Sequence, residues 1–241
     1  ASITVIIFTY PSGSTYSSIP PVGTLNGVAD FPNLSINTAG GYTLVASATG
    51  LTSATSIAFT VVPAPATTLI VIGIPITVTA GTSSSVIVTA KDAFGTTATG
   101  YTGTVTFSSN DPRVTSGTGL PLNSPFASAD AGVRTFNVTL ETAGTRSVTV
   151  TDTANATITG TQSGIIVVHS TLELHFDVSG IPSPIRVGTP ASVTVTAKDL
   201  YNNTVTDYAG TISFSSSDNI SPGGGLPNDY SFVLADNGTH N

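Results

Sequence analysis

The side chains best suited to acid–base or metal chemistry are three histidines: His169, His175 and His240. Nucleophilic catalysis of the serine type requires a histidine within hydrogen-bond reach of the nucleophile, and none of the three falls in the Val/Thr-rich strands expected in the middle of the chain. If residues 169–175 form a strand, His169, Thr171, Glu173 and His175 share one face, with Glu173 and His175 about 7 Å apart. Two ligands do not complete a zinc site. We therefore assign no catalytic, cofactor-binding or metal-binding residue, and keep a weak metal pair as the alternative to linker packing.

Aspartates recur beside expected turns, at Asp92, Asp111, Asp130, Asp152, Asp199, Asp218 and Asp236. Calcium prefers six to eight oxygen ligands, so these carboxylates are candidate ligands. However, the alternation of Asp and Asn around a central Gly that marks a calcium loop is missing. Aspartates at turns commonly accept hydrogen bonds from the local backbone. We expect this structural role and no cofactor, with structural calcium as the alternative.

Lys91 and Lys198 occupy equivalent positions in two repeats, which raises the idea of a lysine–asparagine isopeptide cross-link. That bond requires a buried lysine beside an acid. Because Val86, Val88 and Ala90 are the expected inward positions, Lys91 should point outward, and burying an unpaired ammonium is costly. We expect an ordinary exposed lysine at both positions.

Six asparagines stand in N-x-Ser/Thr sequons: Asn33, Asn137, Asn155, Asn202, Asn219 and Asn237. Such asparagines can carry surface glycans in an exported protein. In a chain so rich in serine and threonine, about four sequons are expected by chance, so the excess is small.

The composition excludes several classes of function. Only 8% of the residues are charged, six of them Lys or Arg, and the net charge is −7, whereas nucleic acid binding requires a clustered basic surface. The longest apolar runs, such as residues 69–76, fall far short of the ~20 residues that cross a bilayer. Cysteine is absent, so no disulfide forms. Serine and threonine make up 71 of the 241 residues and supply the outward positions of strands, a composition typical of exported proteins.

The chain repeats itself at an offset of 107 residues. Residues 191–218, ASVTVTAKDLYNNTVTDYAGTISFSSSD, match residues 84–111, SSVIVTAKDAFGTTATGYTGTVTFSSND, so that Tyr208 corresponds to Tyr101. Beyond the loop at residues 113–119 the offset falls to 106, which indicates a deletion in a surface loop. A period near one hundred, filled with short Val/Thr strands and Gly/Asn/Asp turns, is typical of a two-sheet β-sandwich.

This period predicts three units. Residues 1–62 correspond to the C-terminal part of a sandwich, residues 67–168 to a complete sandwich, and residues 171–241 to the N-terminal part of another. Between them lie Pro63-Ala64-Pro65-Ala66, whose prolines favour a stiff extended connector, and the short segment 169–171. Such connectors predict an extended, semi-rigid rod.

Alternation along the strands identifies the core. Val86, Val88 and Ala90 recur in the next repeat, whereas Ile87 becomes Thr194, so the first three should face inward and Ile87 outward. The other expected inward positions are Val105, Phe107, Val148, Val150, Ile165 and Val167. No segment has a helical period long enough for a helix. We therefore expect an all-β fold.

The strings AKDAFG, TGYTGTVTFSS, TLETAGTRSVTVTDT and LNGVADFPNLSINTAGGYTLVASATGLTSA resemble repeats of large bacterial surface proteins built from immunoglobulin-like domains, such as invasin-like adhesins and surface-layer-associated proteins. The resemblance covers nearly the whole chain. It implies tandem immunoglobulin-like β-sandwiches, one complete and two partial, joined end to end. In such proteins most copies act as spacers, and the resemblance implies no shared catalytic residue. Tyr101, Tyr208, Phe107 and Phe214 then serve as packing anchors.

Together these features predict a non-enzymatic, extracellular structural protein at the cell surface: the spacer or shaft of a stalk, filament or surface layer. The alternative is an adhesin that binds a glycan or protein through sandwich loops, and an accessory domain of an enzyme is a third option. Carbohydrate binding requires exposed aromatic rings. Tyr10, Tyr16 and Tyr230 are the candidates outside core or turn positions.

Partial sandwiches at both ends predict sheet edges that a further strand must cover. One hypothesis is head-to-tail complementation, in which residues 1–62 of one copy complete residues 171–241 of the next and build a filament. The other is that the chain is a window on a longer polypeptide, which the lengths favour because the two pieces together exceed one repeat. The expected partners are neighbouring repeats or other copies of the chain.

Overall fold

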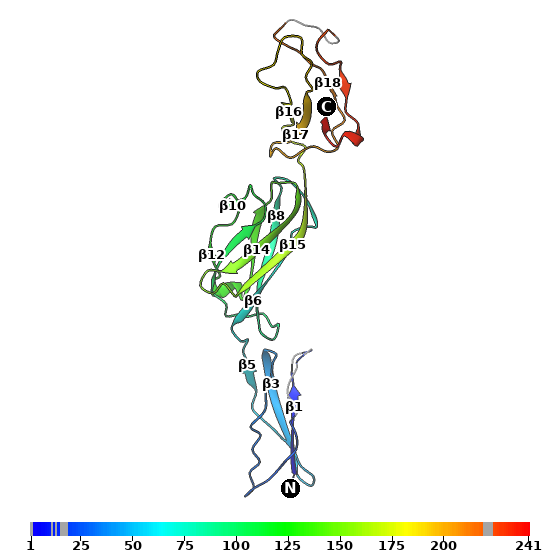
Figure 1. Cartoon of the computed structure of the whole chain (residues 1–241). Helices are drawn as coiled ribbons and strands as arrows, with labels where there is room; N and C mark the ends of the chain where they lie inside the picture. Colours follow the sequence, from blue (N-terminus) through cyan, green and yellow to red (C-terminus); the bar gives the residue numbers. More distant parts are fainter. Residues whose placement is uncertain (1, 11, 13, 15–18, 219–223) are drawn as a thin grey trace.

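The computed structural model of the protein describes residues 2–10, 12, 14, 19–218 and 224–241. Within these residues the only helical segments are two 3₁₀ turns, η1 (Ser128–Asp130) and η2 (Leu234–Asp236), and no helix there is long and apolar enough to span a membrane. Figure 1 shows three groups of strands that follow one another along the long axis, with the two termini at opposite ends. The prediction of an all-β fold without longer helices is confirmed.

The N-terminal unit, residues 2–61, is a single sheet in the described residues. Its strands are β1 (Ser2–Thr9), β2 (Val22–Gly23), β3 (Gly40–Ser47), β4 (Ala54–Thr55) and β5 (Phe59–Val61). The strand order is β2-β1-β3-β4, and β5 also pairs with β3. Ile7 and Tyr42 are buried, whereas Ile6 and Phe8 are more than half exposed. One sheet alone therefore gives this unit a small core.

The middle unit, residues 66–168, is a sandwich of two sheets. Its strands are β6 (Ala66–Ile72), β7 (Thr77–Thr79), β8 (Ser83–Asp92), β9 (Thr104–Ser109), β10 (Thr115–Ser116), β11 (Gly119–Leu120), β12 (Ser124–Pro125), β13 (Val133–Thr139), β14 (Gly144–Asp152) and β15 (Thr159–Val168). One sheet has the order β12-β9-β14-β15-β7 and the other the order β13-β8-β6, while β10 and β11 form a small pair. The β-sandwich architecture predicted from the repeat is confirmed.

The core of the middle unit follows the predicted alternation. Val86, Val88 and Ala90 of β8 are fully buried, whereas Ile87 between them is 36% exposed. The remaining predicted inward positions, Val105, Phe107, Val148, Val150, Ile165 and Val167, are all buried in the same cluster. Because successive residues of a strand point to opposite faces, this set fixes the facing sides of the two sheets.

The last unit, residues 175–240, repeats the first part of the middle unit. Its strands are β16 (His175–Ser179), β17 (Thr194–Lys198), β18 (Thr211–Ile212), β19 (Tyr230–Ser231) and β20 (Thr239–His240), in sheets β16-β17-β20 and β18-β19. Val195, Ile212 and Phe232 form its core, and Tyr208 and Phe214 pack against it. These two aromatic residues therefore act as the predicted packing anchors. The unit boundaries inferred from the repeat, at residues 62, 67, 168 and 171, stay a prediction.

Residues 169–175 do not form the strand that a shared face of His169, Glu173 and His175 would require. β16 begins only at His175, and Glu173 adopts a left-handed backbone conformation with φ of 48°. The chain bends because the Ser170 N–H donates to the buried carboxylate of Asp199, 2.7 Å away. His169, Thr171, Glu173 and His175 consequently do not line up on one strand face.

Candidate functional site

The buried carboxylates organise turns. Asp92, Asp111, Asp152 and Asp199 are each no more than 4% exposed. Asp92 accepts hydrogen bonds from the backbone N–H groups of Phe94 and Thr96, at 3.0 and 2.8 Å. Asp199 does the same with Tyr201 and Asn203, at 2.9 and 2.8 Å. This is the backbone-bonding role predicted for turn aspartates. The carboxylate oxygens of Asp92 and Asp199 face N–H donors. Within the described residues, no three His, Asp or Glu side chains gather closely enough to hold a metal ion.

Hydrogen bonding lowers the pKa of three of these carboxylates, Asp111, Asp152 and Asp199. Burial alone raises the pKa of Asp199, but hydrogen bonds from Asn203, Ser170 and Tyr201 outweigh burial and lower the pKa below its ordinary value. The pKa of Asp111 is lowered in the same way, against burial, chiefly by hydrogen bonds from Thr142. These groups are thereby committed to structure, because a carboxylate with a lowered pKa is a poor proton carrier near neutral pH.

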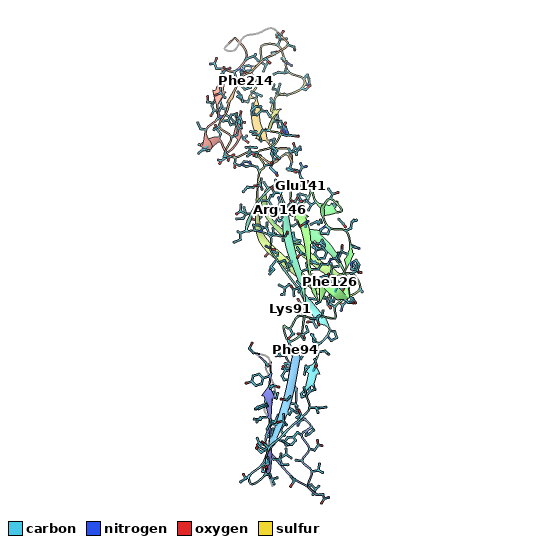
Figure 2. The ribbon with its side chains drawn as sticks, turned by 180° about the vertical axis from the view of Figure 1, so that it is seen from behind. Lys91, Phe94, Phe126, Glu141, Arg146 and Phe214 are labelled. Carbon is cyan, nitrogen blue, oxygen red and sulfur yellow. The ribbon has the colours of Figure 1, made fainter. Side chains whose placement is uncertain are left out.

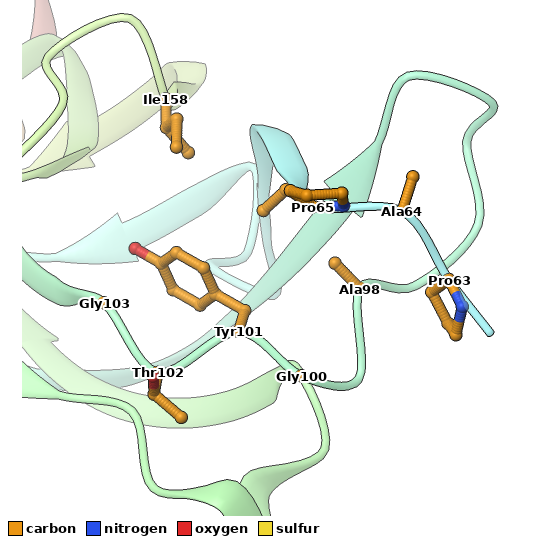
Figure 3. Close-up of a pocket in the computed structure, with 10 residues that line it drawn as sticks. Pro63, Ala64, Pro65, Ala98, Gly100, Tyr101, Thr102, Gly103 and Ile158 are labelled. Carbon is orange, nitrogen blue, oxygen red and sulfur yellow. The ribbon is translucent and has the colours of Figure 1, made fainter.

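A shallow cavity of about 440 Å³ lies beside the first connecting segment, with Pro63, Pro65, Tyr101 and Ile158 among its walls. Figure 3 shows the Tyr101 ring next to this segment. The Tyr101 hydroxyl donates to the Asp152 carboxylate at 2.5 Å, and burial together with this carboxylate raises the pKa of Tyr101. The walls carry no other ionisable side chain. The cavity therefore suits packing of the connecting segment better than acid–base chemistry.

The first junction joins the N-terminal and middle units. The Ala64 N–H donates to the Asp92 carboxylate at 3.2 Å. Figure 2 shows Lys91 and Phe94 at the end of the middle unit that faces the N-terminal unit. Phe94 remains 58% exposed and borders a cavity of about 150 Å³ that Asn37 also lines. A long hydrogen bond thus ties the connecting segment to the middle unit, while an aromatic ring stays partly uncovered.

The second junction joins the middle and last units through a buried amide. Asn203 is 6% exposed, and its Nδ2 donates both to the Glu141 carbonyl at 2.8 Å and to the Asp199 carboxylate at 3.0 Å. Its Oδ1 accepts from the Ala143 N–H at 2.8 Å. Asp199 in turn holds the connecting segment through Ser170. One side chain of the last unit therefore bonds to two backbone groups of the middle unit.

Two further side chains fix this junction. Arg146 donates to the carbonyls of Thr142 and Ala143, at 2.9 and 2.6 Å, and so rigidifies the loop that Asn203 contacts. Tyr201 packs against the core of the middle unit. Gly81 allows this approach, since its φ is +79° and a Cβ there would overlap the Tyr201 hydroxyl. The second junction is consequently a packed interface.

An open groove of about 620 Å³ runs along the second junction, lined in part by threonines and by His169 and Asp207. His169 Nε2 lies 2.9 Å from the Asp207 carboxylate, with His169 largely covered and Asp207 mostly exposed. In the first junction the corresponding residues are Pro63 and Gly100. The same position is therefore polar in one junction and apolar in the other.

The remaining predicted positions have individual outcomes. Lys91 and Lys198 each donate to a threonine hydroxyl at 3.0 Å, at Thr97 and Thr204 respectively. The sequon asparagines Asn33, Asn137, Asn155, Asn202 and Asn237 are exposed, and Asn219 lies outside the described residues.

The three tyrosines proposed as carbohydrate contacts also differ. Tyr10 is half exposed, and Tyr16 lies outside the described residues. Tyr230 stacks on His240 with ring centroids 3.5 Å apart and donates to Asp236. Of the described pair, Tyr10 is the more exposed.

Sequence reasoning missed the junction residues Tyr201 and Asn203. The signal that could have found them lies inside the repeat, where Phe94 corresponds to Tyr201 and Thr96 to Asn203. A turn that keeps an aromatic residue and exchanges threonine for asparagine, next to a connecting segment, marks a position that meets the neighbouring unit.

Two solved structures of surface proteins are among those similar to this chain. No family model and no curated protein sequence matches the chain. The surface layer protein SbsC, domains 4–9, is 18% identical over 78% of this chain with a TM-score of 0.31. The Escherichia coli adhesin FdeC is 21% identical over 99% of this chain with a TM-score of 0.45. The chain spans 29% of the surface layer structure and 74% of the adhesin structure.

Proposed function

We propose that the chain is a non-enzymatic structural segment of an extracellular cell-surface protein, a spacer or shaft that holds its two ends apart. The observation that carries this proposal is the amide bridge from Asn203 to Glu141 and Ala143. A buried hydrogen-bonded group across two units fixes their mutual orientation, because separating them leaves buried donors and acceptors unpaired. A junction with a fixed orientation suits a protein that must hold its two ends apart in a defined direction.

The arrangement of the units supports the same role. Entry and exit of the chain lie at opposite ends of the long axis (Figure 1). The buried carboxylates, which in other proteins supply acid–base chemistry, here hold turns and connecting segments. The partners that suit such a segment are neighbouring repeats or other copies of the chain, arranged along a stalk, filament or surface layer.

Spin-label distances test the proposal, and the absence of cysteine makes site-specific labelling simple. Labels at exposed Ser108 and Ser179 report on the second junction, and labels at Thr52 and Ser108 report on the first. We expect a narrow distance distribution across the second junction and an elongated particle in solution scattering. A compact particle, or a broad distribution across the second junction, would refute the shaft.

An adhesive role is the second candidate, and the outer face of β1 favours it. Ile6 is 51% exposed and Phe8 is 61% exposed. Exposed apolar and aromatic side chains on neighbouring outward positions are a feature of binding surfaces. A glycan and protein array probed with the labelled chain tests this role. Retained signal in a Phe8→Ser variant would argue against β1 as the binding face.

A further inference from the structure

The outer face of the β13-β8-β6 sheet carries an apolar patch that the core does not use. Its members, which we call the apolar outer face, are Ile70, Ile72, Ile87 and Val133, exposed by 41, 53, 36 and 42%. They are neighbours in the sheet: Ile72 pairs with Ile87, and Thr89 pairs with both Ile70 and Val133. Four branched aliphatic side chains therefore form one contiguous surface.

The repeat shows that the fold does not require this surface. The corresponding residues of the last unit are Asp177, Ser179, Thr194 and Thr239. On β17, the strand equivalent to β8, the inward positions are retained, because Val88 and Ala90 correspond to the buried Val195 and Ala197. The same sheet thus folds with polar outward residues, and the aliphatic set is a property of the middle unit alone.

Charge indicates what covers the face. The chain has a net charge of −7 with 13 Asp and Glu residues, so two copies repel over most of their surfaces. The outward positions around the patch are Thr68, Ser83, Ser85, Thr89, Lys91, Thr135, Asn137 and Thr139. They include no carboxylate, and the one lysine lies at the end of β8. Two copies can therefore meet on this face without bringing acidic groups together.

We propose that the apolar outer face is a lateral self-association surface, which a second copy of the chain covers with the same face. Two sheets packed in this way lie about 10 Å apart with strands crossing at about −30°. The proposal rests on the proposed shaft function and adds side-by-side contact between shafts. Four partly exposed side chains bury far less than the ~800 Å² per partner of a standard stable interface. Each contact is therefore weak, in the range of transient association.

The last unit supplies the variant that tests the proposal. We would replace the patch with the residues of the equivalent face, as Ile70→Asp, Ile72→Ser, Ile87→Thr and Val133→Thr in one chain. Because these residues already occur on the same sheet of the last unit, the fold should survive, which circular dichroism checks. The matched control removes exposed apolar residues elsewhere, Ile76→Ser and Leu122→Asn, again using the residues found in the last unit.

Sedimentation equilibrium of the whole chain over about 10 µM to 1 mM, the range of weak contacts, provides the readout. We expect the average mass to rise with concentration for the natural chain and the control, and to stay monomeric for the four-residue variant. Added salt should strengthen association, since it screens the repulsion between acidic chains. A monomeric natural chain at all concentrations, or undiminished association in the variant, overturns the proposal. Scattering at low concentration still reports the elongated shape, so the shaft function is judged separately.

Discussion

At both junctions a buried aspartate of the following unit accepts a hydrogen bond from the connecting segment, Asp92 from Ala64 and Asp199 from Ser170. The first of these bonds is 3.2 Å long and the second 2.7 Å. At the second junction a side chain also bonds to the preceding unit, since Asn203 stands where the first junction has Thr96. A threonine at that position cannot present both an amide donor and a carbonyl acceptor.

The aromatic residues of the two junctions differ in the same way, with closer packing at the second junction. Tyr201 packs on the middle unit, whereas its counterpart Phe94 is 58% exposed. The comparison teaches that the stiffness of a joint between two sandwiches can be set by two or three side chains in one turn, while the sandwich itself stays unchanged.

The largest effect is expected from removing the junction aspartate, which is Asp92 in the first junction and Asp199 in the second. Asp199→Ala strands the N–H groups of Ser170, Tyr201 and Asn203 in a buried place, so we expect a loss of about 2–4 kcal/mol of unfolding free energy in the last unit. Asp92→Ala should cost the middle unit less at the junction, because its bond to Ala64 is longer. Urea unfolding of each variant measures both. Equal losses in the two variants would contradict the ranking of the junctions.

Acid should loosen the second junction, which stays intact at neutral pH. The folded-state pKa of Asp199 lies below its unfolded value of about 3.9, so its carboxylate stabilises the fold above that pH. This stability is lost as the pH falls through the folded-state pKa, and Asp111 follows the same rule. Thermal melts between pH 7 and pH 2 should show the steepest fall below pH ~4. A shallower fall is expected for Asp199→Asn, and an unchanged melting temperature down to pH 2 would exclude this linkage.

Exchanging the residues at the two turns tests whether one amide sets the stiffness. Asn203→Thr should broaden the distance distribution across the second junction, at a cost of about 1–2 kcal/mol. The reciprocal Thr96→Asn should narrow the distance distribution across the first junction. The new amide can bond to the backbone of Asn37 and Ala39, which correspond to Glu141 and Ala143. Spin-label distances report both changes. If neither distribution changes, packing at Tyr201 sets the stiffness instead.

The smallest effect is expected at the ion pair of the groove. Asp207→Gly introduces the residue of the first junction and removes the partner of His169. Because Asp207 is 68% exposed, the pair should contribute less than about 1 kcal/mol. Urea unfolding of this variant and of the natural chain measures the difference. A loss above 2 kcal/mol would show that the groove, and not the turn, holds the junction.

The sandwich itself could be predicted from alternation. Val86, Val88, Val148 and Val150 repeat every second residue, and that pattern has one solution when both sheets bury a face. The turn aspartates were equally predictable, because Asp92 and Asp199 precede Gly- and Asn-containing turns where a carboxylate can bond the backbone.

The joints could not be predicted in this way. Residues 169–175 alternate like a strand, but the bond from Ser170 to Asp199 bends the chain there. That bond joins residues 29 positions apart, so no local pattern signals it. Asn203 was overlooked for a similar reason, because its partners Glu141 and Ala143 lie in the preceding unit, some 60 residues away.

The parallel pairing of β7 with β15 has a mechanical consequence. β7 follows β6, the first strand of the middle unit, and pairs with the end of β15 that leads out toward the last unit. The Ile166 N–H donates to Ile76 and the Ala80 N–H donates to Val168, at 2.7 and 2.9 Å, at the two ends of this pair. Tension applied along the long axis pulls the two strands past each other and loads these bonds together in shear. The sandwich should therefore resist stretching until the whole row fails at once.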